Sequence, residues 1–406
     1  MSEMIESPVH EQSPLQLSVE YSDRVNFAMQ QNGVPLVTEI QITNPTQTTL
    51  EQVTVTVTLE NDECEPWTTR IAAIGPDSTY RVQPEDLALS AKQLATRTEA
   101  ERTAICISVH ASGQSVNKSY PVELLAFDQW PGIGHYPELT AAFVTPNHPR
   151  VVTFLKDART SLGSRSDSDA IDGYQSGSRQ RAALIAEACF HAVATHNIGY
   201  INPPASFATD GQRVRLIDRI CRENFGTCLD LSLLLASLWE QCGLHPLILM
   251  PEGHAMPALW THEAHCPEAA IEEPAQIRNL IELGHIVPVE STLLTQPNPS
   301  FNAAVESAKR RMSQPGGTFC AIDIKAGRKR GVLPLPLRDG DTTVVDLELI
   351  TSTGKPTTAQ STLDRLELAE RAEQMSRSPL LTDTDESPSD RIARWQKRLL
   401  DLSLRN

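Results

Sequence analysis

Short runs of alternating apolar and polar residues dominate the chain between residues 15 and 127. In the clearest run, Val53 to Leu59, valine or leucine alternates strictly with threonine, the period of a β-strand with one buried face. Similar runs occur at LQLSVEYS, LVTEIQIT, TAICISVHA and YPVELLAF, separated by turn signals such as NG, NPT and GPDS. This pattern predicts an immunoglobulin-like β-sandwich over residues 15–127, with a scaffold or docking role.

Beyond residue 178 the apolar positions first adopt a helical period. The stretch RQRAALIAEACFHAVATHNI places Ile185, Cys189 and Val193 in one row of an amphipathic helix. A leucine-rich helix is expected from Cys228, closed by Gly243, and the runs LHPLILM, HAMPALW, HIVPVESTLL and TFCAIDIKA predict strands. Residues 179–350 therefore read as an α+β domain.

The remaining segments are polar, or rich in proline, glycine and serine. We expect a disordered N-terminus over residues 1–14. Residues 128–178 predict a packed connector, then a short helix and a mobile loop. Residues 351–390 predict a linker around one charged helix. The last segment, residues 391–406, has the sequence RIARWQKRLLDLSLRN. It predicts the opening helix of a following domain that this chain truncates.

Composition narrows the protein class. The 406 residues are 40% hydrophobic and 21% charged, which are globular values, and the net charge of −16 argues against binding a nucleic-acid backbone over the whole surface. No run approaches the roughly 18 apolar residues of a membrane span, and the N-terminus lacks signal-peptide features. Eight cysteines without a CxxC pair predict free thiols. We expect a cytoplasmic protein without membrane partners.

The strongest candidate chemistry lies at the leucine-rich helix. Thr227 is a plausible N-cap and Asp230 can complete a capping box, which places Cys228 in the first turn, where N–H groups and the helix dipole favour a thiolate. His254 follows the strand LHPLILM in a Gly-His-Ala turn, and Glu290 is the sole acid in HIVPVESTLL. We predict that thiol, imidazole and carboxylate converge beside a solvent-reachable slot.

Plainer interpretations stand beside this one. Cys228 can be a core residue, His254 a turn residue and Glu290 the partner of an arginine. An open groove at Cys228 would favour an enzyme, whereas a plugged cleft would favour a binding platform.

Two further kinds of cluster are candidate binding sites. The segment THEAHCPE offers three zinc ligands without a fourth at a familiar spacing, so a polar loop is favoured and neither a metal nor a cofactor is predicted. Basic clusters at Lys309–Arg311 and Lys325–Arg330 favour solvated faces, although a nucleic-acid clamp would use them and bind DNA with steep salt dependence.

The three candidate segments resemble the transglutaminase-like branch of the papain-type cysteine fold. Its motifs read approximately G-x-C-x-D/E, G-H-A-W and W-V-P-V-D-P-T. The matching positions here are, in that order, Gly226, Cys228 and Asp230, then Gly253, His254 and Ala255, then Val287, Pro288, Val289, Glu290 and Thr292. The resemblance implies that Cys228 is the nucleophile, His254 the general base and acid, and Glu290 the orienting carboxylate.

This chain departs from the motifs at several positions. Glu290 replaces the usual aspartate, Ser291 the proline, and Met256 the tryptophan after the histidine. The motifs identify no upstream oxyanion donor, so Gln212 and Asn224 are candidates beside the backbone N–H of Cys228.

A narrower resemblance covers nearly the whole chain. Segments such as PELTAAFVTPNHP, GTCLDLSLLLAS, GLHPLILMPEGHA and RWQKRLLDLSLRN are similar to the N-terminal region of large bacterial superfamily-1 helicase-like proteins associated with defence against foreign DNA. This resemblance implies that C-terminal helicase domains of a longer chain are partners, and that nucleic acid is bound through those domains. The chain itself contains no Walker A motif.

The expected function is therefore a cysteine hydrolase, a protease or isopeptidase, acting on a protein or peptide substrate. Acyl transfer to an amine is the variant of the same chemistry. The alternative is a catalytically inactive sensor or docking platform for the attached helicase.

Overall fold

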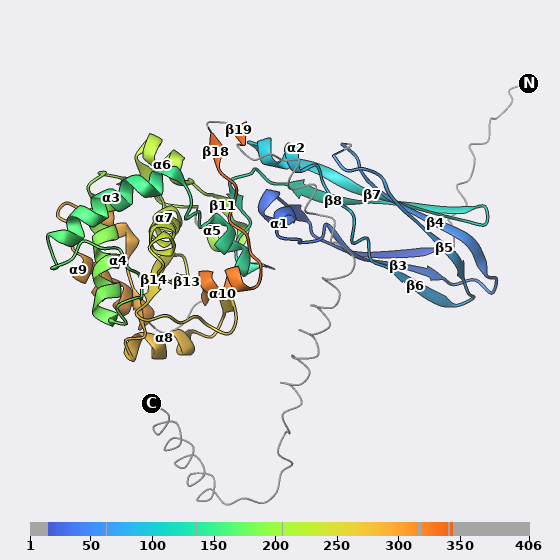
Figure 1. Ribbon diagram of the computed structural model, residues 1–406. Coiled ribbons are helices and arrows are strands. Elements are labelled where there is room, and N and C mark those ends of the chain that lie inside the picture. Colours follow the sequence, from blue (N-terminus) through green and yellow to red (C-terminus); the bar gives the residue numbers. More distant parts are fainter. Residues whose placement is uncertain are drawn as a thin grey trace, which may run out of the picture. The chain divides into compact units, whose positions relative to one another are not determined.

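The computed structural model describes residues 15–61, 63–134, 136–204, 206–314, 319–339 and 342–343. The predictions for residues 1–14, 351–390 and 391–406 lie outside these ranges. The described chain is a mixed α and β protein with several separate sheets (Figure 1). Among its described residues, no helix combines the length and the apolar character needed to cross a membrane.

Residues 15–127 form two sheets. A three-stranded antiparallel sheet has the order β1-β3-β6, with β1 at Gln16–Tyr21, β3 at Val37–Asn44 and β6 at Ser78–Val82. A five-stranded sheet has the order β2-β8-β7-β4-β5, with β2 at Arg24–Val25, β8 at Gln114–Leu124, β7 at Glu101–Ala111, β4 at Leu50–Leu59 and β5 at Trp67–Ile74. Two short helices accompany them, α1 at Phe27–Gln31 and α2 at Ala91–Thr96.

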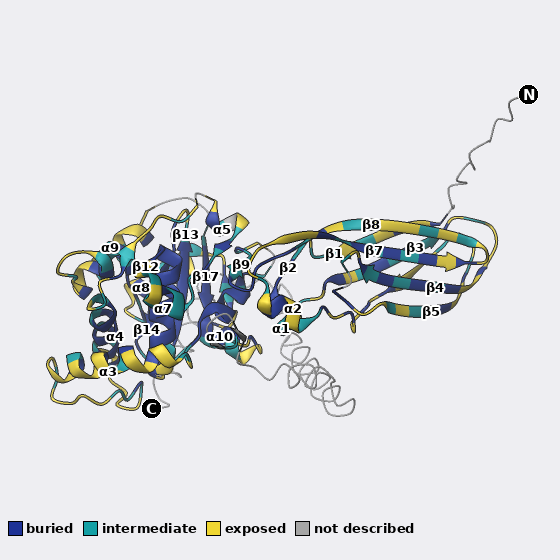
Figure 2. Ribbon diagram, turned by 90° about the horizontal axis from the view of Figure 1, so that it is seen from above, coloured by how far each residue is buried: buried dark blue, intermediate teal, exposed yellow. Residues whose placement is uncertain are grey.

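The alternation read from the sequence sets which face of each strand is buried. Val53, Val55, Val57 and Leu59 are buried on β4, while the threonines between them are partly exposed (Figure 2). This period of two explains the strands, and the immunoglobulin-like relationship stays a prediction.

The second half of the described chain is built around one antiparallel sheet of order β15-β17-β13-β14-β16. Its strands are β15 at Ala270–Ile271, β17 at Phe319–Asp323, β13 at Pro246–Pro251, β14 at Met256–Trp260 and β16 at Ile286–Pro288. The helices are α3 at Pro149–Gly163, α4 at Arg179–Ala194, α5 at Phe207–Asp210, α6 at Ile217–Glu223, α7 at Cys228–Gln241, α8 at Pro274–Glu282, α9 at Phe301–Met312 and α10 at Ile324–Lys329, with 3-10 helices η1 at Pro137–Phe143 and η2 at Ser291–Thr295.

Three two-stranded pairs complete the topology. They are β9 (Gln129–Trp130) with β11 (Gln212–Arg213), β10 (Gly199–Tyr200) with β12 (Phe225–Gly226), and β18 (Arg338–Asp339) with β19 (Thr342–Thr343). The β10–β12 pair is parallel. Strand β12 is followed by the N-cap residue Thr227 and then by the first residue of α7.

Helix α7 is central because it is apolar on nearly every side. It packs against β13 and β14 and against α3 and α4 (Figure 1). Leu231, Leu235 and Trp239 of α7 join Phe154 of α3 and Ile185 of α4 in one buried cluster. Residues of the opposite sheet face, including Leu247 and Met256, form a second cluster with α8 and α9.

Two local expectations differ from the structure in their extent. The short helix expected within residues 128–178 is the 15-residue helix α3, which follows η1, and Val151 and Phe154 of α3 are core residues. The loop that follows α3 is held by the Arg181 guanidinium, which bonds Asp172, Ser166 and backbone carbonyls.

The predicted strand HIVPVESTLL also ends early, at Pro288. Glu290 caps a 3-10 helix instead, because its carboxylate accepts the Thr292 N–H at 3.2 Å.

Candidate active site

Cys228 is the first residue of α7, as its sequence context predicts. Thr227 is the N-cap, and its Oγ1 accepts a hydrogen bond from the Asp230 N–H at 3.2 Å. Asp230 returns the bond by accepting the Thr227 N–H on Oδ2 at 2.9 Å, which completes a capping box. The thiol therefore lies in the first helical turn, beside unpaired N–H groups and the positive end of the dipole.

The backbone of Cys228 is also fixed from the far side. The Ser232 hydroxyl donates to the Cys228 carbonyl at 2.6 Å, and the Ser291 hydroxyl reaches the same oxygen at 3.4 Å. The two hydroxyl oxygens lie 3.1 Å apart, and both serines are fully buried. This contact ties the start of α7 to the segment that carries Glu290, and Ser291 can make it because the motif's proline is absent here.

His254 lies in the turn between β13 and β14. Its N–H donates to the Pro251 carbonyl at 3.0 Å, and its ring Nε2 lies 3.0 and 2.9 Å from the two carboxylate oxygens of Glu290. The ring also hydrogen-bonds the Cys228 thiol. Because Nε2 is engaged by Glu290, Nδ1 is the ring nitrogen left to bond the sulfur. Sulfur, imidazole and carboxylate are thus brought together from three separate segments.

The electrostatics of this group favour a charged imidazole. Burial alone lowers the pKa of His254, but hydrogen bonds with Cys228 and Glu290, and the negative charge on both, outweigh it and raise the pKa to about 9. For Glu290, burial acts in the opposite direction and raises the pKa of the carboxyl. The bonds with His254 and Thr292 nevertheless leave this pKa below its usual value. An imidazolium facing a carboxylate can hold a thiolate on its other side.

Glu290 has more partners than the sequence suggested. The Thr292 hydroxyl donates to Oε1 at 2.8 Å, and the Arg311 Nε lies 3.7 Å from Oε2. Arg311 belongs to the last turn of α9, in the basic cluster that we expected to be a solvated face. Sequence reasoning missed this contact because no local pattern links residue 311 to residue 290.

Tyr200 is the second residue that the sequence did not single out. Its phenol hydrogen-bonds the Cys228 thiol, and Glu290 and Arg311 influence its charge. Burial, then the interaction with Cys228 and the charge of Glu290, raise the pKa of Tyr200 to about 12. The position follows from β10, where Tyr200 pairs with Gly226. A two-residue parallel pairing leaves no signal in the sequence.

Neither predicted side-chain oxyanion donor is directed at the thiol by its contacts. Gln212 is buried and its Nε2 donates to the Thr227 Oγ1 at 3.3 Å, while its Oε1 has no hydrogen-bond partner among the described residues. Asn224 has a left-handed backbone with φ of 55° at the end of α6, on the surface. Its carbonyl accepts the Gly199 N–H at 2.7 Å and so holds β10 in place. The backbone N–H of Cys228 remains the candidate donor.

The predicted solvent-reachable slot is not open at the thiol. Cys228 is 0% exposed, His254 7% and Glu290 4%. The Tyr200 phenol lies against the sulfur and is itself 37% exposed, so it belongs to the layer that separates the thiol from solvent. The arrangement matches a triad in its contacts and a plugged cleft in its accessibility.

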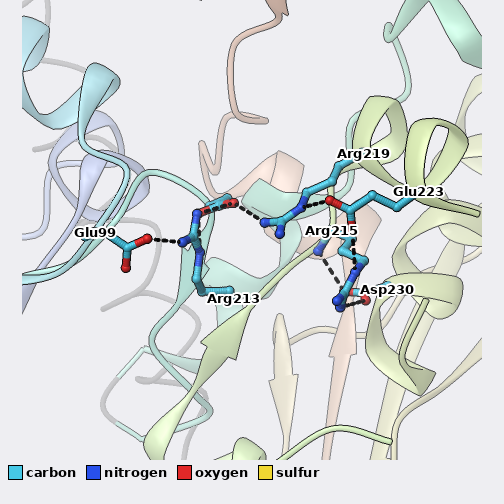
Figure 3. A network of polar contacts seen from close by, with 7 residues as sticks. Glu99, Arg213, Arg215, Arg219, Glu223 and Asp230 are labelled. Atoms are coloured by element: carbon cyan, nitrogen blue, oxygen red, sulfur yellow. Dashed lines mark hydrogen bonds and ion pairs between the residues drawn. The ribbon is translucent and has the colours of Figure 1, made fainter. Parts of the chain in front are cut away.

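A chain of alternating charges supports the start of α7 (Figure 3). Arg213 bonds both Glu99 and Asp128, and Arg219 links Asp128 to Glu223. Arg215 then bonds Glu223 through Nε at 3.0 Å and, through its backbone N–H, Asp230 at 2.9 Å.

Asp230, at the end of this network, is fully buried. Burial raises the pKa of its carboxyl, against the opposing bonds from Thr227 and Arg215. The network therefore supports a buried charge next to the candidate nucleophile.

The THEAHCPE segment and the second basic cluster, Lys325–Arg330, make structural contacts. The Asp323 carboxylate accepts the Cys266 N–H at 2.8 Å, and His265 bonds the Cys266 carbonyl, so the THEAHCPE segment is a bonded loop. In the second basic cluster, Arg328 bonds Glu240 at 2.9 Å and Lys329 lies 2.7 Å from His265. The Arg328–Glu240 ion pair thus neutralises one of the positive charges that a nucleic-acid clamp would use.

Comparisons with known proteins place the chain only loosely. No protein-family model matches it, and no curated protein matches it in sequence. Among solved structures, a candidate protease from Parabacteroides distasonis aligns with 62% of this chain and 48% of its own length, at 12% identity and a TM-score of 0.18. The alignment thus spans less than half of that protein.

Proposed function

We propose that this chain is a transglutaminase-like cysteine hydrolase that cleaves a peptide or isopeptide bond, with Cys228, His254 and Glu290 as its triad. The proposal depends chiefly on one observation, the bond between His254 Nε2 and the Glu290 carboxylate while the same ring contacts the thiol. The role of each residue, as nucleophile, general base and acid, or orienting carboxylate, follows from the chemistry of its side chain and agrees with the motif resemblance.

In this mechanism the thiolate attacks the scissile carbonyl carbon and the charge passes to the carbonyl oxygen. The N–H groups of the first turn of α7 can receive that oxyanion. The imidazolium then gives its proton to the leaving amine, and the acyl group stays on sulfur. The neutral imidazole takes a proton from a water molecule, whose oxygen attacks the acyl carbon, so that the C–S bond breaks, the acid is released and the thiolate–imidazolium pair is restored. Glu290 orients the ring and stabilises its charge at each stage.

The surface beside the thiol suits an apolar part of a peptide. Tyr200, Ile201 and Phe225 are exposed by 37%, 42% and 51%, and all three lie on or beside the β10–β12 pair. Exposed large apolar side chains grouped at one place are typical of a binding surface. The wider role, as the N-terminal module of a helicase-like bacterial defence protein, rests on sequence resemblance alone and concerns segments outside the described residues.

The proposal is tested by acylation with p-nitrophenyl acetate. A reactive triad gives a burst of one nitrophenolate per chain and an acetyl group on Cys228 by peptide mass mapping, and Cys228→Ala and His254→Ala lose both. Cys189, fully buried in the same core, is the internal control. Acetylation of Cys228 no faster than that of the other cysteines would remove the activated nucleophile.

The second candidate function is a docking platform, favoured by the 0% exposure of the thiol. A platform predicts no acetyl-enzyme. It also predicts that Cys228→Ala in the full-length protein keeps the cellular phenotype of the wild type.

A further inference from the structure

The position of Tyr200 is set by the backbone on both of its sides. The Gly199 N–H donates to the Asn224 carbonyl at 2.7 Å, and the Ile201 N–H donates to the Gly226 carbonyl at 3.0 Å. These bonds hold residue 200 beside β12, which runs directly into the N-cap of α7. Strand β10 also packs against η2, the helix that Glu290 caps. Tyr200 is therefore fixed between the two ends of the candidate triad.

From this position the hydroxyl of Tyr200 contacts the sulfur of Cys228. The sulfur then has two side-chain hydrogen-bond partners, the His254 ring and the Tyr200 phenol. The other charged groups around Tyr200 are Glu290 and Arg311, and Asp230 lies on the same helix turn as the thiol. The carboxylate of Glu290 repels a thiolate. Arg311 offsets that repulsion only in part, because it is already paired with Glu290.

We infer that Tyr200 is a further catalytic residue of the site proposed above, its hydroxyl donating a hydrogen bond that stabilises the negative charge on the Cys228 sulfur. A phenol can play this part only while it keeps its proton. The raised pKa of Tyr200, about 12, keeps it a donor throughout the neutral range. The inference rests on the proposed function, but it concerns the ionisation of the thiol, which is measured without any substrate.

The experiment titrates the ultraviolet absorbance of the thiolate, taken as the difference between each protein and its Cys228→Ala counterpart. This difference isolates one of the eight cysteines and needs no reagent to enter a buried site. Tyr200→Phe keeps the ring and removes the hydroxyl. We expect it to raise the midpoint by about one pH unit, a roughly tenfold loss of thiolate below the midpoint.

Tyr80→Phe is the matched control. Tyr80 is a similarly exposed tyrosine, at 44%, on β6 of the N-terminal sheets, and its removal leaves the midpoint unchanged. An NMR titration of the His254 ring accompanies the measurement. A loss of packing alone would shift the ring and the thiol together with a fall in unfolding temperature, whereas a lost donor shifts the thiol at unchanged stability.

The outcomes separate the two proposals. A midpoint in Tyr200→Phe equal to that of the wild type overturns the inference, because the phenol would then only cover the thiol. A wild-type midpoint as high as that of an ordinary cysteine, about 8.5, would instead contradict the proposal that Cys228 is an activated nucleophile. In that case a still higher midpoint in Tyr200→Phe would leave the donor role of Tyr200 standing.

Discussion

Glu290 is one methylene longer than the aspartate of the motif that it resembles, and it meets Nε2 of His254 with both carboxylate oxygens. Together with the hydrogen bond to Cys228, this double contact favours the charged ring. Glu290→Gln removes the negative charge and one acceptor, so we expect the pKa of His254 to fall from about 9 toward its ordinary value near 6.5. The measurement is an NMR titration of the ring.

Glu290→Asp is the control for this substitution, because it keeps the charge and shortens the reach. It should retain most of the raised pKa. The same pair affects folding. Since the folded pKa of His254 lies above its unfolded value, its stabilising contribution is complete below about pH 6.5 and is lost as the pH rises through 9. An unfolding free energy that falls equally with pH in Glu290→Gln and in the wild type would contradict this account.

Residues with a strong local context could be predicted from the sequence. Cys228 follows a helix cap, His254 follows an apolar strand, and Glu290 is the single acid of an apolar run. Tyr200 and Arg311 could not be predicted, because each reaches the site through tertiary packing of an element that has no distinctive pattern.

At the scale of elements, the start of α7 depends on the buried carboxylate of Asp230. Asp230→Ala removes the reciprocal half of the capping box and leaves the Thr227 and Arg215 N–H groups without their acceptor. We expect the unfolding free energy to fall by about 2–3 kcal/mol, the cost of a lost cap plus unsatisfied buried donors. Urea denaturation measures it.

The N-cap of α4 supplies the matched control. Ser178 caps α4 from an exposed position, by accepting the Arg181 N–H at 3.2 Å. Ser178→Ala should cost about 1 kcal/mol or less, because water can replace the lost bond. Equal losses in the two variants would show that the buried carboxylate adds nothing beyond an ordinary cap.

The elements themselves were predicted unevenly. Helix α7 and strands β13, β14 and β17 follow from long or strongly apolar runs. The strand predicted through Glu290 was wrong beyond Pro288, since a side-chain cap formed a 3-10 helix that apolar alternation cannot reveal. Helix α3 was expected only as a short helix after the connector rich in proline and glycine, whereas its 15 residues pack along α4.

At the scale of the whole described molecule, the charge network joins the β-rich half to the helix that carries the thiol. Asp128 is its centre, because Arg213 and Arg219 both bond this largely buried carboxylate. Asp128→Asn removes the negative charge between the two guanidinium groups and leaves Arg213 paired only with Glu99 and Arg219 only with Glu223. We expect a fall in unfolding free energy of about 1–2 kcal/mol, reduced from the value for a fully buried pair because both arginines are about one-third exposed.

Arg159→Gln tests whether ion pairs in general produce this effect. Arg159 and Asp169 form an isolated pair at 2.7 Å with both side chains well exposed. Its removal should change the unfolding temperature by little. If Asp128→Asn were as mild, the network would be a surface feature and would not support α7.

Gly199 touches neither the sulfur nor the imidazole, yet a methyl group at this position would come within 2.8 Å of the Phe225 ring. Any larger residue must displace that ring, which belongs to the strand paired with the next residue, Tyr200. In a genetic screen, substitutions at this glycine would then score as losses of chemistry, although position 199 carries no reactive group of its own.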